Sequence, residues 1–464
     1  MKRLIYITLC VVASMIGAKA SAQMLSSYFM EGSYFRNELN PALAPTRGYV
    51  ALPVMSGVGV DLKNNYLSVG NFYFKNGNEV VTALHESVSA DKFLRRLPNT
   101  GKTAVNANVN ILGVGFHTRR SFWNFGINLR TNNDFALSKD VFKVLKSLGN
   151  GYYDLKKTSL SSNTYTELYV GNSRKVVDLG YGTLTAGAKL KVLVGLMNIS
   201  AQFDKMYADV SADNVSGHMQ GSIRANGLIF NPPKVETGDE LWNEIIHEDI
   251  SAMLNNFNNF GVGVDLGVEM TLLDEHLRVS AAITDLGFIK WSADTHIEAE
   301  TNADFYFKGV NFETGEADSA AEANIYLKDV ADGGYATRLN CGFNLGAEYN
   351  VLEDRIGFGL LSYTEFCQTA TISELTASVN FRPAGWFSAT VSHTLFNRNR
   401  LGVFGFALNL HPAGFNFFVG ADYLPLKMVT YNDIPVPYNA KSLNLHMGIG
   451  FNLGKAKNKQ NYIL

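Results

Sequence analysis

Apolar and polar residues alternate along most of the chain from about Thr103 onward. Between 260 and 270, phenylalanine, valine, leucine and methionine occupy the even positions, whereas glycine, aspartate and glutamate occupy the odd ones. A period of two over this length predicts a strand with two different faces. Strands in soluble sheets usually have about five or six residues, whereas strands of about ten cross a membrane at a tilt.

The polar face of these segments carries mostly asparagine and glycine, with isolated charges of both signs. A soluble surface would be richer in lysine and glutamate, so this face suits a crowded polar lumen. We count 14 such segments, and an even number suits a closed antiparallel barrel with both termini on one side. They lie near 103–116, 121–131, 163–171, 181–197, 198–210, 260–270, 276–286, 335–349, 355–366, 373–382, 386–395, 401–410, 415–424 and 440–453.

The connections between these segments divide into short and long ones. Barrels of this kind have short periplasmic turns and long outer loops. The expected periplasmic turns lie at 273–275, 353–354, 382–385 and 411–414, and the long outer connections at 211–259, 287–334 and 425–439. In this count the stretch 132–162 falls on the periplasmic side, although it contains an expected helix over 138–148.

Two further segments lack the alternating pattern of the wall strands. Residues 24 to about 100 contain an expected helix from Val80 to Leu97, and they form either a lumen plug or extra wall strands from Gly48 to Leu62. Residues 237–257 have helix-spaced apolar positions and predict a second amphipathic helix that caps the outer side. The predicted fold class is therefore all-β: a transmembrane antiparallel β-barrel of about 14 strands, with an N-terminal plug-like segment and helical insertions.

The first residues have the order of a secretory signal peptide. Lys2 and Arg3 precede an apolar run, and Ala20-Ser21-Ala22 forms a cleavage pattern. The expected organisation is a signal peptide over 1–22, a plug-like or periplasmic segment over 23–100, the outer-membrane barrel over 101–454 and a C-terminal tail over 455–464.

Composition narrows the class of protein. Charged residues make up 18% of the chain and aromatic residues 12%, which argues against disorder. The formal net charge of −2 becomes −5 once Lys2, Arg3 and Lys19 are removed with the signal peptide. A nucleic-acid partner is excluded because there is no basic footprint.

No catalytic or metal-binding pattern emerges from the sequence. His85-Glu86 and His247-Glu248 lack a second histidine at the spacing that a zinc site needs. We therefore expect no enzyme activity, no cofactor and no metal. Across the turn at 271–276, Glu269 is expected to face Arg278 as a charge pair in the lumen, where opposed charges contribute about 0.2–1 kcal/mol.

Two short motifs resemble those of a known family. Asn40-Pro41-Ala42-Leu43 resembles the Asn-Pro-Ala box of FadL-like outer-membrane proteins, and 285–291 (DLGFIKW) resembles a strand-end segment of Gram-negative barrels in that superfamily. The resemblance implies a 14-stranded barrel with an N-terminal plug that passes hydrophobic molecules through a lateral opening. It nominates Asn40, Pro41 and Ala42 as plug elements, although Asn40 and Pro41 also have the chemistry to shape a simple turn.

Two functions from different classes follow from these expectations. The first is transport of hydrophobic, fatty-acid-like compounds across the outer membrane, with lipid and a hydrophobic small molecule as partners. The alternative is a structural or accessory barrel for protein secretion or surface attachment, with secretion-machinery proteins as partners and the long outer loops as the docking surface. A third candidate function is that of an outer-membrane enzyme.

Overall fold

The computed structural model describes most of the chain from Leu25 to Lys455. The described residues are 25–51, 57–76, 79–147, 151–210, 215–228, 258–310, 317–327, 333–368, 371–396, 399–424, 428–431, 434–437 and 442–455. The expected signal peptide, the expected helix over 237–257 and nearly all of the expected tail lie outside them. Within these ranges, no helix has the length and apolarity needed to span a bilayer.

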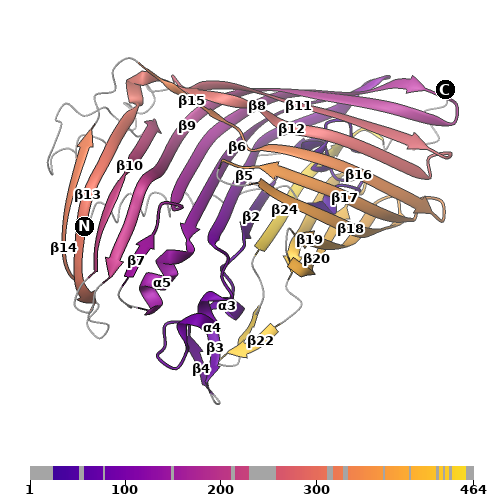
Figure 1. The fold of residues 1–464 in the computed structure, drawn as a ribbon. Helices are drawn as coiled ribbons and strands as arrows, with labels where there is room; N and C mark the ends of the chain where they lie inside the picture. The colour runs from indigo at the N-terminus through magenta and orange to yellow at the C-terminus, as the bar shows by residue number, and fades with distance from the viewer. Residues whose placement is uncertain are drawn as a thin grey trace.

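A closed antiparallel sheet forms the body of the molecule (Figure 1). Most wall strands pair with the wall strands before and after them in the chain, and the last pairs with the first. The wall consists of β1 (Gly48–Ala51), β2 (Val58–Asn64), β5 (Thr100–His117), β6 (Ser121–Ser138), β8 (Ser159–Asp178), β9 (Gly182–Val210), β11 (Phe260–Leu272), β12 (Leu277–Trp291), β15 (Tyr335–Arg338), β16 (Cys341–Val351), β17 (Ile356–Phe366), β18 (Thr371–Ala384), β19 (Phe387–Phe396), β20 (Asn399–Leu410), β21 (Phe415–Leu424) and β24 (Ser442–Leu453).

Two positions in this wall are each filled by a pair of short strands. β1 and β2 both lie between β24 and β5, and β15 and β16 follow one another along β12. The wall therefore has the fourteen positions of the expected barrel. Among the described wall strands, closure leaves no unpaired edge, which is the condition for a sheet to lie in lipid.

The two faces of the wall strands differ as the alternation predicts. Large apolar side chains point outward and are roughly half exposed, among them Leu190, Val262, Leu286, Phe358 and Met447. The inward positions on the same strands hold buried asparagine, serine, threonine and charged residues. An apolar outer surface around a polar interior is the pattern of a transmembrane barrel, so the expected fold class is confirmed.

The two ends of the barrel differ in the length of their connections. One end, called the turn end below, holds only short connections: 118–120, 179–181, 273–276, 352–355, 385–386 and 411–414. The four short turns expected from the sequence are among them. The opposite end is called the loop end, and it carries the longer connections.

Two assignments made from the sequence are wrong, and their effects on the strand count cancel. The segments expected at 181–197 and 198–210 are one strand of 29 residues, β9. The change of phase between them is a register shift in the pairing with β8, at Gly195 and Met197, and not a turn. The first wall position is filled by β1 and β2, as in the alternative of extra wall strands from Gly48 to Leu62, so the wall begins at Gly48 and not near 101 as the strand count assumed. Because the two strands expected over 181–210 are one, every strand before β9 runs in the opposite direction to the one expected. The described part of the stretch 132–162 therefore lies at the loop end.

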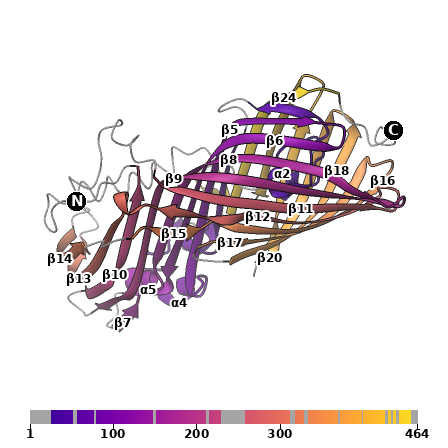
Figure 2. The ribbon, with the colours of Figure 1, turned by 90° about the horizontal axis from the view of Figure 1, so that it is seen from above.

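A second sheet region continues the wall beyond the barrel at the loop end. The second half of β9 pairs with β10 (Val215–Gly227), β10 with β13 (Ile297–Val310), and β13 with β14 (Ala317–Leu327). The short strand β7 (Gly151–Asp154) pairs with the end of β9 on its other side. Figures 1 and 2 show these strands projecting away from the closed part of the barrel.

A small helical unit also lies at the loop end. It contains α3 (Val69–Phe72), the hairpin of β3 (Tyr73–Asn76) and β4 (Glu79–Thr82), α4 (Ala90–Leu94) and α5 (Lys139–Ser147). The expected helix over 138–148 is present as α5. The expected helix over 80–97 is wrong except for α4, because Val80 and Val81 pair with β3 in a hairpin. The remaining short elements are η2 (Ala293–Thr295), β22 (Met428–Tyr431) and β23 (Ile434–Pro437).

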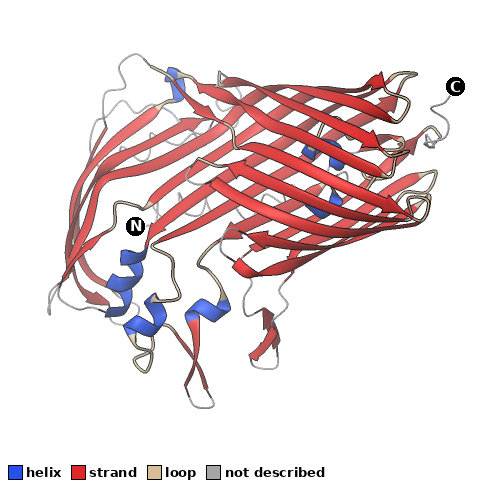
Figure 3. Cartoon of the chain, turned by 45° about the vertical axis from the view of Figure 1, so that its right-hand side comes forward, coloured by secondary structure: helices blue, strands red, loops and turns tan. Residues whose placement is uncertain are grey.

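The residues before β1 lie inside the barrel, where Figure 3 shows short helical pieces between the strands. We call the described residues 25–47 the plug. The plug contains η1 (Leu25–Ser27) and α2 (Arg36–Leu39), and its aromatic side chains Tyr28, Phe29, Tyr34 and Phe35 are buried against the inner face of the wall.

Candidate functional site

The Asn40-Pro41-Ala42 motif lies in the plug, directly against the inner wall. Asn40 is completely buried, and its Nδ2 atom donates to the Tyr28 hydroxyl at 3.2 Å and to the Val268 carbonyl oxygen at 3.3 Å. Its Oδ1 atom accepts from the backbone N–H of Ala42 at 2.9 Å. Asn40 therefore both shapes the local turn and joins this segment to β11.

Several wall side chains hold the plug by donating to its backbone carbonyl groups. A buried carbonyl group needs a partner, and the short helical pieces of the plug leave many without one. The donors come from strands around the whole barrel, so the plug is fixed from several sides. They are Asn344 to Leu39 (2.8 Å), Lys189 to Asn37 (3.3 Å), Ser173 to Ala42 (3.0 Å), Asn416 to Gly32 (2.7 Å) and Arg382 to Phe29 (2.8 Å).

The structure changes the role of the expected charge pair. Glu269 lies opposite Ser280 in the β11–β12 ladder, and Arg278 lies opposite Thr271, so the expected register is wrong by two residues. The turn occupies 273–276, so its centre lies one residue further along the chain than that of the expected turn at 271–276, which shifts the pairing by two residues. Both side chains face the lumen and bind the plug: Glu269 lies 3.7 Å from Arg36, and Arg278 forms an ion pair with Glu31.

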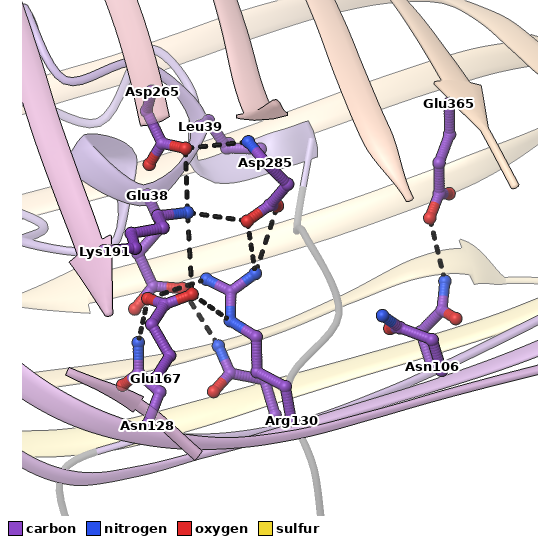
Figure 4. A network of polar contacts seen from close by, with 12 residues as sticks. Glu38, Leu39, Asn106, Asn128, Arg130, Glu167, Lys191, Asp265, Asp285 and Glu365 are labelled. Atoms are coloured by element: carbon purple, nitrogen blue, oxygen red, sulfur yellow. Dashed lines mark hydrogen bonds and ion pairs between the residues drawn. The ribbon is translucent and has the colours of Figure 1, made fainter. Parts of the chain in front are cut away.

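A cluster of buried charges lies in the lumen around Lys191 (Figure 4). The Nζ atom of Lys191 lies 2.8 Å from Asp265, 2.6 Å from Asp285 and 3.5 Å from Glu167. Arg130 bridges two of the same carboxylates, with 3.0 Å to Glu167 and 3.1 Å to Asp285. Because the desolvation cost of buried ions is large, such a cluster is stable only when the charges compensate one another.

Asp285 reaches this cluster because of a β-bulge in β12. The register between β11 and β12 shifts next to Asp265, and Asp285 has a φ of +58°. Its backbone N–H donates to Asp265 at 2.7 Å. The extra residue places both Thr284 and Asp285 inside and reverses the alternation beyond them, as a bulge does.

A second charged cluster lies across the lumen and is centred on Lys63 of β2. Its Nζ atom lies 3.1 Å from Asp61, 3.1 Å from Glu365 and 3.4 Å from Glu374. Asn106 also donates to Glu365 at 3.0 Å. Residues of the two clusters together line a cavity of about 40 Å³, so along this section the described lumen is filled by polar side chains.

An apolar cluster on the inner face interrupts this polar lining on the loop-end side of the bulge. Its members are buried side chains from β8, β9 and β12 and from the junction between β15 and β16, and the Trp291 indole N–H donates to the Thr337 hydroxyl at 2.8 Å. We call this set the inner apolar cluster: Tyr165, Leu193, Ile289, Trp291 and Leu339.

Most of these lumen residues were not singled out by the sequence analysis. Lys63, Arg130, Lys191 and Asp285 sit at inward positions of alternating strands, and that position was the available signal. The alternation predicts which face of a strand a residue occupies. It does not predict which inward charges meet across the lumen, because it carries no information on non-neighbouring strands. Among the described residues, no group of three or more His, Cys, Asp or Glu side chains could hold a metal ion.

These features together define a transmembrane β-barrel whose lumen is closed by its own N-terminal segment. The architecture implied by the FadL-like resemblance, fourteen strands around an N-terminal plug, is the one observed. The chain belongs to the family of unknown function DUF5723, whose model matches residues 41–422.

Comparison with solved structures finds similar barrels at low sequence identity. The Ralstonia pickettii toluene transporter TbuX aligns with 9% identity and a TM-score of 0.42, covering 94% of this chain and 96% of that one. The Pseudomonas putida toluene transporter TodX aligns with 8% identity and a TM-score of 0.37, covering 94% and 95%. A comparison with curated proteins found no match.

Proposed function

We propose that this protein is an outer-membrane barrel that transports small hydrophobic molecules and releases them sideways through its wall. The outer surface supports the location, because half-exposed apolar side chains ring the wall strands as lipid contact requires. The positions of the plug and of the inner apolar cluster support release sideways through the wall.

A polar lumen is an unfavourable path for an apolar solute. The axial path runs past the Lys191 and Lys63 clusters and then meets the plug, and a solute passing there would separate buried charges from their partners. Leaving a buried charge uncompensated costs several kcal/mol, about 3–5 in measured cases. A hydrophobic solute therefore needs an exit before it reaches the charges.

The observation that carries the proposal is an interruption in the wall beside the inner apolar cluster. Residues 277–284 of β12 pair with β16, whereas 288–291 pair with β15. Between these two ladders, the Leu339 N–H donates to the Gly287 carbonyl oxygen at 3.0 Å. The side chains of Leu339, Ile289 and Trp291 lie on the inner face directly beside this break, so an apolar surface meets an interruption in the pairing of the wall.

Uptake of radiolabelled naphthalene by cells that express the full chain tests the proposal. Leu339→Asp places a charge in the inner apolar cluster and should lower the uptake rate about tenfold, since burying a charge costs more than the roughly 1.4 kcal/mol that corresponds to this factor. Phe288→Ala is the control, because Phe288 lies on β12 next to Ile289 of the cluster but points outward with 48% exposure. Uptake no faster than in cells without the protein would refute the transport function.

A second candidate function, an accessory barrel for surface-exposed proteins, is favoured by the sheet region beyond the wall. β10, β13 and β14 extend β9 past the barrel and offer a large surface at the loop end. Affinity purification in mild detergent tests this candidate. A stoichiometric protein partner that is lost when residues 297–327 are deleted would favour it over transport.

A further inference from the structure

Positive charge is concentrated in the small helical unit at the loop end (Figure 1). The unit consists of residues 66–98 together with α5. These segments contain seven basic and four acidic residues, a formal net charge of +3, whereas the whole chain has −2. The unit is therefore the part of the loop end that an anionic partner would favour.

The helical unit packs on the outer face of the wall and not over the lumen. Gly101 of β5 is paired with Leu137 of β6. The Tyr66 ring lies against Gly101, where an added Cβ atom would meet it at 2.8 Å, and Leu137 packs against the apolar core of the unit. Asn106 of β5 faces the lumen and donates to Glu365. Gly101 lies an odd number of residues away, so it faces outward.

This attachment lies just beyond the apolar band of the wall. Val105 and its partner Leu62 are outward-facing apolar residues, whereas the next outward pair, Thr103 and Asn64, is polar. Gly101 is four residues beyond Val105, or about 13 Å along the tilted strand. The unit therefore continues the lipid-facing surface at the level where the wall leaves the hydrocarbon and enters the headgroup layer.

The outer face of the β3–β4 hairpin combines a cation with apolar side chains. Lys75 is the cross-strand partner of Val80, and Tyr73 lies two residues before Lys75 on the same face. All three side chains are exposed. Lysine and tyrosine suit a membrane surface, because each places a polar end in water and an apolar part against lipid.

Two leucines extend this apolar surface at the other side of the unit. The Nζ atom of Lys146 donates to the His85 carbonyl oxygen at 2.7 Å, which joins the end of α5 to the connection between β4 and α4. The neighbouring residues Leu145 and Leu84 are both more than half exposed. Exposed leucines beside cations are the composition of a segment that binds at a lipid surface.

Three cations of the unit are available to an anion. Lys75, Lys92 and Arg95 are exposed, and among the described residues none of them has an ion-pair partner. Lys143 of α5, in contrast, lies 2.6 Å from Asp140. A lipid headgroup that carries phosphates would supply the missing counter-charges, and its acyl chains would lie beside the exposed apolar residues.

We propose that the helical unit binds the phosphate-bearing headgroups of the glycolipid that forms the outer leaflet of the outer membrane. Long connections mark the outer side of such barrels, so the loop end meets this leaflet. Each lysine or arginine near an anionic lipid surface strengthens binding about fivefold. The inference rests on the outer-membrane location in the proposed function and not on transport.

Native mass spectrometry of the purified full chain in a nonionic detergent tests the ligand. The probes are lipid A with its phosphates, the same lipid without phosphates, and inorganic pyrophosphate. We expect phosphorylated lipid A to bind at least about tenfold more tightly than the dephosphorylated form. Equal affinity for the two lipids would overturn the proposal. Pyrophosphate that displaced the lipid at equal concentration would also overturn it, because the unit would then be a simple anion site.

A charge variant locates the site. Lys75→Gln/Arg95→Gln removes two exposed cations, and the affinity for phosphorylated lipid A should fall about tenfold or more. Arg119→Gln/Arg120→Gln is the matched control, because it removes the same charge from exposed positions in the β5–β6 turn at the opposite end. Equal losses in the two double variants would reduce the effect to net charge and overturn the proposal.

An apolar variant tests the contact with the acyl chains. Leu84→Ser/Leu145→Ser should weaken binding about tenfold and leave the compact gel mobility of the barrel unchanged, since neither side chain is buried. Unchanged affinity would contradict the lipid contact. The same spectra report the oligomeric state, and a dimer that this variant dissociates would assign the surface to a second copy of the chain instead.

The outcome is distinguishable from that of the transport function. If naphthalene is taken up but lipid A does not bind through Lys75 and Arg95, the lipid site is wrong and the transport function stands. If lipid A binds through these residues although naphthalene is not taken up, the lipid site stands and hydrophobic transport is wrong.

Discussion

Gly187 of β9 and Gly267 of β11 face each other across the paired strands, and the plug lies directly on both of them. A Cβ atom at Gly187 would overlap the backbone of Pro41, and one at Gly267 would overlap the Asn40 side chain. The absence of two neighbouring side chains therefore forms a notch in the wall, into which the Asn40-Pro41 turn fits.

Filling this notch should unseat the plug. Gly187→Val places a branched side chain where the Pro41 backbone lies, and overpacking of this kind costs about 1–3 kcal/mol. The barrel wall should still close, since valine is favoured in strands. We expect a higher single-channel conductance in planar bilayers and faster protease cleavage within 25–47.

Gly263→Ala provides the control for this experiment. Gly263 lies on β11 and also faces inward, but the nearest atom to an added Cβ would be Leu339 Cδ1 at 3.4 Å, which is an ordinary contact. Conductance and protease sensitivity should remain those of the unmodified protein. Equal conductance in the Gly187 and Gly263 variants would show that the notch does not hold the plug.

Asp285→Asn should destabilise the barrel strongly. Asparagine keeps the shape and tolerates the positive φ at this position, but it removes one of the carboxylates shared by Lys191 and Arg130. Breaking a buried ion pair costs about 3–5 kcal/mol. The variant should therefore lose the compact gel mobility of the folded barrel at a lower temperature than the unmodified protein. Lys143→Gln, in an ion pair whose lysine is 40% exposed, should change stability by less than about 0.5 kcal/mol. Similar losses in both variants would contradict a special role for the cluster.

The turn at 411–414 should make stability depend on pH. Burial, and to a smaller extent the nearby Arg47 cation, lower the pKa of His411 from 6.5 to about 4. The folded state therefore holds the neutral ring, and its stabilising contribution is complete above about pH 6.5 and lost as the pH falls toward 4. Over this window the loss should reach about 3 kcal/mol.

His411→Gln tests this assignment, because glutamine is neutral at every pH in the window. Urea unfolding followed by tryptophan fluorescence should show a smaller drop in stability between pH 6.5 and 4 for the variant. An identical pH dependence in the two proteins would assign the effect to other groups.

Glu353→Gly should stabilise the protein. Leu352, Glu353 and Asp354 all have φ between 54° and 66°, the left-handed region, where a residue with a Cβ atom is strained by about 1 kcal/mol. The ion pair lost with Glu353 is solvent-exposed at 3.9 Å and contributes little. The unfolding temperature should rise, and a fall would mean that the side chain has a contact role that outweighs the backbone strain.

The faces of the wall could be predicted from the sequence because each strand reports its own alternation. The strand number came out correctly only because β9 was divided in two while β1 and β2 were left out of the count. Alternation shows that a segment is extended, but it does not show where a strand ends when no turn residue marks the end. The short strand β1 has too few residues for a period of two to stand out.

The bulge at Asp285 left a trace in the sequence that could have been used. Apolar residues occupy odd positions up to Ile283, whereas the next two, Leu286 and Phe288, occupy even positions, although the apolar Ile289 and Trp291 that follow are odd again. A change of phase such as that between Ile283 and Leu286 is what a bulge produces. The contacts of the plug left no comparable trace. Asn40 and Arg278 reach partners far away in the sequence, and the identity of those partners depends on closure of the whole ring.

The seam of the wall joins the two ends of the chain, since β1 and β2 pair with β24. During synthesis β24 is made last, so the ring stays open until the whole chain is available. The plug immediately precedes β1 and must already lie on the inner side when the ring closes. Enclosing the plug and completing the wall are therefore a single step of assembly, and a chain that lacks β24 would have no interior in which to keep it.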